Sequence, residues 1–244
     1  MPIKQKIWLD TDIGDDIDDV LALYLGLHMP EIEIVGISTV FENTDLRARM
    51  AKKCVTLARR PIPVFAGIGT PDGGENFRGT KHRFCQYTPD LSSDEYAPVN
   101  THSPIDGESA VDALLAAVAR YGSALTVLAI GPLTNVAHAI RRAPDVMRQV
   151  GRVVFMGGSF YTQFREWNIV CDVEAAATVF SSDVPLECVG TDVTDLTEIS
   201  RRDHDEYLSA SGDDPLSAYL FECIRLWTDD YRRKILLHDP LTLY

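Results

Sequence analysis

The sequence predicts an α/β protein built on an open, mostly parallel, doubly wound sheet with helices on both faces. Short apolar runs with strand propensity alternate with longer runs of helical periodicity, and such alternation produces parallel strands joined by right-handed crossovers. The chain has 244 residues, of which 45% are hydrophobic, and this suits one large core. We therefore expect a single domain over residues 1–244.

Three strands and two helices are expected before residue 67. The strands begin at residues 7, 33 and 64, and the helices cover about 18–28 and 45–60. The second helix places apolar side chains on one face, from Leu46 to Ala58. Pro61 and Pro63 follow it, and because proline does not continue a helix, a short strand at 64–66 comes next.

Residues 67–103 interrupt this alternation. The segment is polar, rich in Gly, Pro, Asp and Ser, and has no clear period. A segment of this length without regular structure is usually functional or mobile. His82, Arg83, Phe84 and Tyr87 are placed to close over a ligand, although a surface insertion is the simpler explanation for any one of them.

The alternation of strands and helices resumes beyond this segment. Apolar residues at 111, 114, 115 and 118 have helical spacing, and Gly131 with Pro132 opens another helix. Further strands are expected at 125–130, 152–156 and 185–190. A loop through Trp167 leads to a helix at about 172–181, and helices are expected within 203–231.

Composition excludes several functions. The 23 basic and 36 acidic residues give a net charge of −13, so nucleic acid and anionic membranes are not expected partners. No apolar run approaches the roughly 20 residues that span a bilayer, and the first residues lead into a strand rather than a signal peptide, so we expect a cytoplasmic protein. The five cysteines form no CxxC pair, and we expect buried free thiols rather than disulfides or zinc ligands.

Six aspartates are crowded directly after the first strand. They are Asp10, Asp12, Asp15, Asp16, Asp18 and Asp19. Like charges this close repel one another unless a cation neutralises them, and all-oxygen sites suit hard cations such as Ca²⁺ or Mg²⁺. A solvated turn and helix cap would explain Asp16, Asp18 or Asp19. It would not explain Asp10 and Asp12 at a strand end, where open α/β sheets place their ligands, so the stretch predicts a metal or catalytic site.

Parallel strands also bring their carboxyl ends to one edge of the sheet. The residues expected there are Asp10, Asp12, 39–43, Ile130, 156–168, Thr191 and Asp192. The functional site is therefore expected along this edge.

Six blocks of sequence resemble the nucleoside hydrolase family, specifically its inosine-uridine preferring type. They are DTDIGDDIDDVLAL (10–23), STVFEN (38–43), LAIGPLTN (128–135), VFMGG (154–158), EWN (166–168) followed by DVEAA (172–176), and HDP (238–240). The blocks occur in family order across nearly the whole chain. The resemblance implies a Rossmann-like fold and a hydrolase that splits the N-glycosidic bond of ribonucleosides, giving ribose and a free purine or pyrimidine base for salvage.

The resemblance also implies roles for individual residues. A Ca²⁺ ion would be held by the side chains of Asp12, Asp19 and Asp239 and by the Ile130 carbonyl. Asp12 would also be the base for the attacking water. The groups that hold the ribose hydroxyls would be Asp18, Asn43, Glu166 and Asn168, with Met156 beside them and Asp10 in support. His238 would be a candidate acid for the leaving base.

Each of these residues also has an ordinary structural explanation when taken singly. Asn43 and Asn168 suit turns or helix caps, Glu166 suits a solvated loop, Met156 suits the core, and His238 alone is more often structural. Their joint occurrence in family order favours the functional interpretation.

Three features depart from the family pattern. Two extra residues separate Asp12 from Ile17, so Asp15 and Asp16 compete with Asp18 and Asp19 as the functional pair. The loop after Gly158 is expected to be shortened and has no counterpart of a family asparagine. The chain also ends at Tyr244, and we expect exposed apolar surface there, from Leu236, Leu237, Leu241 and Leu243.

Two other functions remain open at this stage. A Mg²⁺-dependent phosphatase of the haloacid dehalogenase type also has Asp-x-Asp after an apolar strand, but Thr or Val should follow the first aspartate by four residues, and Gly14 stands there. A non-catalytic nucleoside- or ribose-binding relative is the second alternative. The preference between purines and pyrimidines, and a homo-oligomer such as a dimer or tetramer, are left open.

Overall fold

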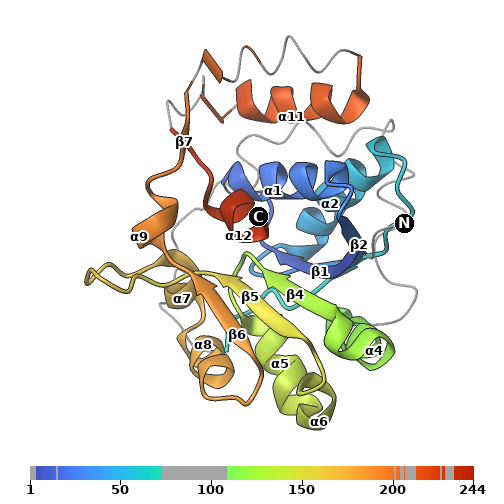
Figure 1. The fold of residues 1–244 in the computed structure, drawn as a ribbon, viewed down its shortest axis with the longest axis vertical. Coiled ribbons are helices and arrows are strands. Elements are labelled where there is room, and N and C mark those ends of the chain that lie inside the picture. Colours follow the sequence, from blue (N-terminus) through green and yellow to red (C-terminus); the bar gives the residue numbers. More distant parts are fainter. Residues whose placement is uncertain are drawn as a thin grey trace.

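Parallel strands form the centre of the molecule in the computed structural model, which describes residues 4–14, 16–72, 109–200, 202–203, 206, 213–225, 227–228 and 234–244. Within these ranges, six strands form one sheet in the order β3-β2-β1-β4-β5-β6, and every neighbouring pair is parallel (Figure 1). The strands are β1 (Gln5–Thr11), β2 (Ile32–Thr39), β3 (Val64–Ala66), β4 (Leu125–Ala129), β5 (Arg152–Met156) and β6 (Leu186–Val189). The predicted fold class is confirmed.

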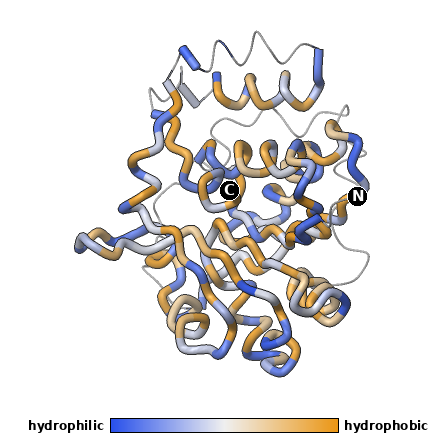
Figure 2. Tube along the Cα trace, viewed as in Figure 1, coloured by the Kyte–Doolittle hydropathy of each residue, from blue (hydrophilic) through white to orange (hydrophobic). Residues whose placement is uncertain are grey.

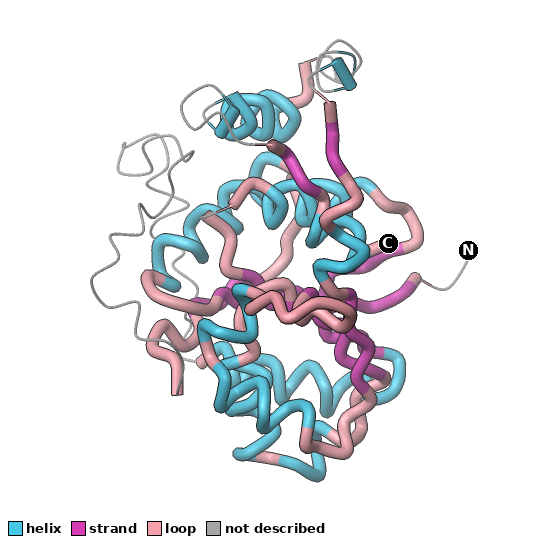
Figure 3. The backbone as a smooth tube through the Cα atoms, turned by 90° about the vertical axis from the view of Figure 1, so that its left-hand side faces the viewer, coloured by secondary structure: helices cyan, strands magenta, loops and turns pink. Residues whose placement is uncertain are grey.

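Helices cover both faces of this sheet (Figure 3). One face carries α1 (Asp18–His28) and α2 (Thr44–Leu57), with α11 (Pro215–Arg225) packed outside them. The other face carries α4 (Ala110–Tyr121), α5 (Thr134–Arg142), α6 (Pro144–Met147) and α8 (Val173–Phe180). Each layer buries its own apolar cluster against the sheet, and the strands are mostly hydrophobic in Figure 2. Burial on both faces explains why the strands read as continuous apolar runs.

Several short elements are absent from the sequence-based prediction. They are a 3-10 turn (Gly122–Ala124), α6, α7 (Trp167–Cys171), α9 (Thr191–Thr194), the antiparallel pair β7 (Glu198–Ile199) and β8 (Ile235–Leu236), and α12 (His238–Leu243). The loop was predicted to run through Trp167, but it ends at Glu166. The side chain of Glu166 caps α7, which begins at Trp167. Elements of two to six residues are too short to show a period.

The second helix also ends earlier than predicted. α2 stops at Leu57 rather than near Arg60, and Arg59 has a positive φ of 54°. The backbone therefore leaves the helical region before the two prolines are reached.

Two predictions about side-chain environment can be checked. The four described cysteines are free thiols, with Cys54, Cys171 and Cys223 buried, as expected, while Cys85 lies outside the described residues. The apolar side chains near Tyr244 are partly buried rather than exposed, and Leu243 packs against the core, which corrects the expectation. The candidates His82 to Tyr87 also lie outside the described residues. Among the described helices, none has the length and apolar character needed to cross a bilayer.

The order of the strands reverses between β1 and β4. From β1 the chain moves outward through β2 and β3, then returns to β4 and moves outward through β5 and β6. A reversal of this kind opens a crevice at the carboxyl ends of the two central strands, where doubly wound folds bind their ligands.

Candidate functional site

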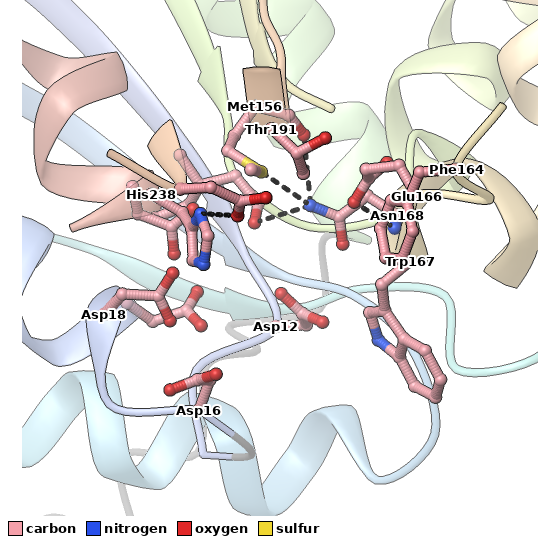
Figure 4. A pocket seen from close by; sticks show the side chains of 14 residues that line it. Asp12, Asp16, Asp18, Met156, Phe164, Glu166, Trp167, Asn168, Thr191 and His238 are labelled. Carbon is pink, nitrogen blue, oxygen red and sulfur yellow. Dashed lines mark hydrogen bonds and ion pairs between the residues drawn. The ribbon is translucent and has the colours of Figure 1, made fainter. Parts of the chain in front are cut away.

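A cavity of about 400 Å³ lies at the carboxyl edge of the sheet, next to this reversal (Figure 4). Its walls come from Asp12, Asp16, Asp18, Asp19, Ile130, Met156, Phe164, Glu166, Trp167, Asn168, Thr191, Asp195, His238 and Asp239. This volume falls in the range of small-ligand pockets. The cavity therefore collects most of the predicted site residues, although they are spread along the chain from residue 12 to residue 239.

Three buried carboxylates form the floor of the site. Asp18 and Asp19 are the first residues of α1, and Asp239 is in the first turn of α12, which packs against α1. Each offers one oxygen, and these three oxygens lie within 4.8 Å of one another. Burial raises the pKa of all three carboxyls, and repulsion from neighbouring aspartates raises each pKa further. Such a cluster is suited to a hard cation.

Asp12 faces the same cavity from the loop after β1, but it is not one of these three carboxylates. It is buried, and its charge contributes to the raised pKa of Asp18, Asp19 and Asp239. Gly131 lies directly beside it, since a Cβ at Gly131 would be 2.8 Å from Asp12 Oδ1. The predicted metal ligands included Asp12 and not Asp18, whereas the three carboxylates that lie together include Asp18 and not Asp12.

The structure separates the two competing aspartate pairs. Asp18 and Asp19 are buried in the trio, and Thr11 Oγ1 donates a hydrogen bond to Asp19 Oδ1. Asp16 is exposed at the cavity wall and accepts a hydrogen bond from the Ile17 amide at 2.6 Å. Asp15 lies outside the described residues. The positions of the described carboxylates thus favour Asp18 and Asp19 as the pair within the site.

Asp10 lies behind the cavity in a hydrogen-bonded network. Its Oδ1 accepts from Ser38 Oγ at 2.6 Å and from Asn135 Nδ2 at 2.7 Å. Ser38 in turn accepts from Trp8 Nε1 at 2.8 Å. Burial raises the pKa of Asp10 to about 7, against the lowering effect of these hydrogen bonds. Asp10 therefore joins β1, β2 and α5 at the strand ends.

The opposite wall is built on α7. Both oxygens of Glu166 accept backbone hydrogen bonds, Oε1 from Asn168 at 2.8 Å and Oε2 from Ile169 at 3.0 Å and Gly158 at 3.1 Å. Asn168 Nδ2 donates to the carbonyls of Met156 at 3.0 Å and Ile130 at 3.3 Å. Glu166 is buried rather than solvated, and burial raises its pKa. Hydrogen bonds to the backbone thus fix these two predicted ribose-binding side chains in the wall, Glu166 as a helix cap and Asn168 through its amide.

His238 begins α12 on the side of the cavity nearest α9. Its Nδ1 lies 2.7 Å from Thr194 Oγ1 and 3.9 Å from Asp195 Oδ1. Burial lowers the pKa of the imidazole, and the carboxylate of Asp195 opposes this shift only in part. Since Nδ1 is used by Thr194, any proton delivered into the cavity must come from Nε2.

Asn43, like Asp10, is a predicted site residue that is not among those lining the cavity. Its side chain is exposed and accepts a hydrogen bond from the Leu46 amide at 3.2 Å, which caps α2. The cap satisfies one of the unpaired amides at the start of the helix. The described geometry therefore supports the structural explanation of Asn43 rather than a ribose contact.

Five wall residues have no individual role in the sequence-based prediction. They are Asp16, Phe164, Trp167, Thr191 and Asp195. Four of them were expected near the site, since Asp16 belongs to the competing aspartate pair and the other three fall in the segments expected at the edge of the sheet. Asp195 lies beyond those segments, and no motif marks it.

The comparisons with known proteins agree with this geometry. Residues 7–244 match the family described as "Inosine-uridine preferring nucleoside hydrolase". A probable uridine nucleosidase of Arabidopsis thaliana is 31% identical, over 98% of this chain and 76% of that protein. The pyrimidine-specific ribonucleoside hydrolase RihA of Salmonella schwarzengrund is 29% identical, over 97% of this chain and 78% of its own length.

Solved structures of nucleoside hydrolases are also similar to this chain. A plant nucleoside hydrolase has a TM-score of 0.75 at 28% identity and covers 99% of this chain and 78% of its own. A purine-preferring ribonucleoside hydrolase from Gardnerella vaginalis has a TM-score of 0.77 at 27% identity, over 98% of this chain and 78% of its own.

Proposed function

This chain belongs to the inosine-uridine preferring nucleoside hydrolase family and hydrolyses the N-glycosidic bond of ribonucleosides, and we propose that it does so with Ca²⁺ held by the carboxylates of its cavity. The observation that carries the proposal is the buried trio of Asp18, Asp19 and Asp239. Family membership decides against the phosphatase alternative.

The donor set fits a hard divalent cation. Burying several carboxylates together is unfavourable unless their charge is compensated, and the raised pKa of each member expresses that cost. Ca²⁺ accepts six to eight oxygen ligands with flexible geometry, and carboxylate oxygens and a backbone carbonyl such as that of Ile130 are ligands it prefers. When bound, such a cation offsets the negative charge of the site and makes a water molecule easier to deprotonate.

Asp12 is the proposed base in this reaction. It faces the cavity beside the trio, and its carboxylate takes the proton from the water that attacks the anomeric carbon. Asp18, Glu166 and Asn168 face the ribose, with Met156 beside them. Their hydrogen bonds to the sugar hydroxyls favour flattening of the ring toward an oxocarbenium-like transition state.

His238 is the proposed donor of a proton to the leaving base. Burial lowers the pKa of this imidazole more than Asp195 raises it, so proton donation by His238 should weaken as the pH rises toward neutrality. Phe164 and Trp167 extend the wall beyond the polar groups, where a flat base can stack on an aromatic ring.

Three further properties stay predictions. The named relatives include uridine-, pyrimidine- and purine-preferring proteins, so the base preference of this chain has to be measured. A homo-oligomer, as a dimer or tetramer, is testable by light scattering. A cytoplasmic location is consistent with the free thiols of the four described cysteines.

Ribose release from a panel of nucleosides tests the function. The chain is incubated with uridine, cytidine, inosine, adenosine and guanosine, with Ca²⁺ or with a chelator, and reducing sugar is measured. We expect release from at least one nucleoside with Ca²⁺, loss of release with the chelator, and recovery when Ca²⁺ is restored. Nucleoside binding in a calorimeter without base release would instead support the non-catalytic alternative.

A further inference from the structure

Arg47 is a fully buried charge on α2, directly beside the acidic loop. Its Nε donates a hydrogen bond to the Phe41 carbonyl at 2.8 Å, and its Nη1 donates to the carbonyls of Asp12 and Ile13, the latter at 3.2 Å. A planar guanidinium presents several donors in a fixed arrangement, so one side chain holds three backbone oxygens at once.

These three oxygens belong to two different turns. Asp12 and Ile13 follow β1 and lie beyond its last pairing with β2, between Thr11 and Thr39. Phe41 follows β2, and both it and Glu42 have positive φ, 69° and 54°, which is unfavourable for side chains other than glycine. Arg47 therefore supplies contacts to the acidic loop and to a strained turn beside it.

The second turn supports the aromatic wall of the cavity. The rings of Phe41 and Trp167 meet edge to face, with centroids 6.4 Å apart, and Trp167 lines the cavity. Arg47 thus connects the backbone that carries Asp12 with the residue on which Trp167 packs.

The charge of Arg47 also acts on the carboxylates. It lowers the pKa of Asp19, against the larger effects of burial and of Asp12 and Asp18, which raise it. A cation buried next to the loop reduces the mutual repulsion of these carboxylates, because charges interact strongly where water is excluded.

We propose that Arg47 is a positioning residue that fixes Asp12 and the aromatic wall of the cavity relative to each other. It acts through the carbonyls of Asp12, Ile13 and Phe41. Its consequence for turnover rests on the proposed function, whereas its consequence for the acidic loop does not.

Lys53 provides a matched control on the same helix. It is also a buried cation, but its ammonium lies over the ring of Tyr219, 3.9 Å from the centroid, on the side of α2 that faces α11. Lys53 is not among the residues that line the cavity. Lys53→Met therefore removes a buried charge from α2 without touching the acidic loop.

The test compares Arg47→Lys and Arg47→Gln with Lys53→Met. Lysine keeps the positive charge but lacks the planar guanidinium with its several donors. Glutamine keeps an amide donor but lacks the charge. In both Arg47 variants we expect Ca²⁺ affinity, measured by calorimetry, to fall about 10- to 100-fold, the loss typical when groups that orient metal ligands are removed. We expect kcat to fall by a similar factor with little change in KM, and the Ile13 amide to exchange hydrogen faster without metal. Lys53→Met should fold and change none of these three quantities.

Folded Arg47 variants that bind Ca²⁺ and exchange the Ile13 amide like the unmodified chain would overturn the proposal. So would loss of folding in both Arg47 variants while Lys53→Met folds, because Arg47 would then serve general stability. If the unmodified chain binds Ca²⁺ but releases no base, the proposed function fails, and the Ca²⁺ titration still tests Arg47. If it binds no Ca²⁺ either, the exchange of the Ile13 amide is the remaining test.

Discussion

At the scale of single residues, burial decides what each carboxylate of the acidic loop can do. Asp16 and Asp18 are two positions apart, yet Asp16 is exposed at the cavity wall and Asp18 is buried with Asp19 and Asp239. Glu166, on the opposite wall, combines a helix cap with a place in the cavity. A carboxylate oxygen has more than one lone-pair direction, so capping leaves it able to accept from a sugar hydroxyl as well.

Replacing Asp12 by asparagine should nearly abolish hydrolysis. The change keeps the shape of the side chain but removes both a negative charge beside the metal and the proposed base. Turnover should fall by more than about 10³, which corresponds to several kcal/mol of barrier. Steady-state release of ribose from the best substrate of the panel measures this loss.

The exposed Asp145 of α6 supplies the control. Asp145→Asn makes the same chemical change far from the cavity and should leave turnover unchanged. Circular dichroism and the melting temperature establish that both variants fold. A folded Asp12→Asn protein with near-normal turnover would show that another group is the base.

Recognition of the sugar should be stricter than recognition of the base. Asp18, Glu166 and Asn168 are buried groups that line the cavity, and a site built to bond a hydroxyl leaves such groups unpaired when that hydroxyl is missing. We expect kcat/KM for 2′-deoxyuridine to be at least about 100-fold below that for uridine. 5-Methyluridine, which changes only the base, should stay within about tenfold of uridine. Equal kcat/KM for uridine and its 2′-deoxy form would mean that these three residues do not hold the 2′-hydroxyl.

At the scale of elements, α1, α7 and α12 each bring a carboxylate to the cavity at the start of the helix. α1 starts with Asp18 and Asp19, α7 is capped by Glu166, and α12 starts with His238 and Asp239. Backbone amides at a helix start are unpaired and carry partial positive charge, which favours nearby carboxylates. The helix starts therefore lower the cost of gathering acidic side chains at this edge of the sheet.

Variants of Asn43 can separate a helix cap from a ribose contact. Asn43→Ala removes the acceptor for the Leu46 amide and should lower the free energy of unfolding by about 1 kcal/mol. Asn43→Ser restores a capping oxygen on a shorter side chain and should recover most of that stability. Urea unfolding measures the first effect. If kcat/KM falls at least about tenfold in both variants, the side chain contacts substrate instead.

At the scale of the whole molecule, the site depends on contacts between distant parts of the sequence. α12 contacts α1, β5 and α9, so Asp239 reaches Asp18 across more than two hundred residues of chain. α12 lies outside the central sheet, so its packing against these elements holds it in place. A cation shared between Asp239 and the start of α1 would add a direct link.

Ca²⁺ should therefore stabilise the fold through Asp239. Binding to the folded state alone contributes about 2.7 kcal/mol at a hundredfold excess over the dissociation constant. For a chain of this length this raises the melting temperature by roughly 5–10 °C. Hydrogen exchange at the amides of α12 should slow in parallel, and Asp239→Ala should remove both effects.

Thr242→Ala is the matched control on the same helix. Thr242 Oγ1 donates to the His238 carbonyl at 2.9 Å, so its loss weakens α12 without removing a carboxylate. This variant should melt earlier than the unmodified chain but keep the rise caused by Ca²⁺. If Ca²⁺ changes neither melting nor exchange in the unmodified chain, the metal assignment is wrong.

The sequence by itself determined the fold class, five of the six central strands nearly to the residue, and the edge on which the site lies. These follow from local causes, because apolar periodicity reports burial and proline and glycine limit the backbone. It also marked Asp12, Asp18, Asp19, Glu166, Asn168, His238 and Asp239, through motifs that resemble a family.

Only the tertiary structure decided which of those residues meet. In the structure Asp18 and Asp19, but not Asp16, lie in the buried trio. Asn43 caps α2 and does not line the cavity. Arg47 lies beside the acidic loop and donates a hydrogen bond to the Asp12 carbonyl. Each outcome depends on how α2, α7 and α12 pack around the reversal in strand order, and such packing joins residues that no local spacing connects. Sequence patterns indicate which face of a helix or strand a residue occupies. The distances between side chains from separate elements are set only when those elements pack together.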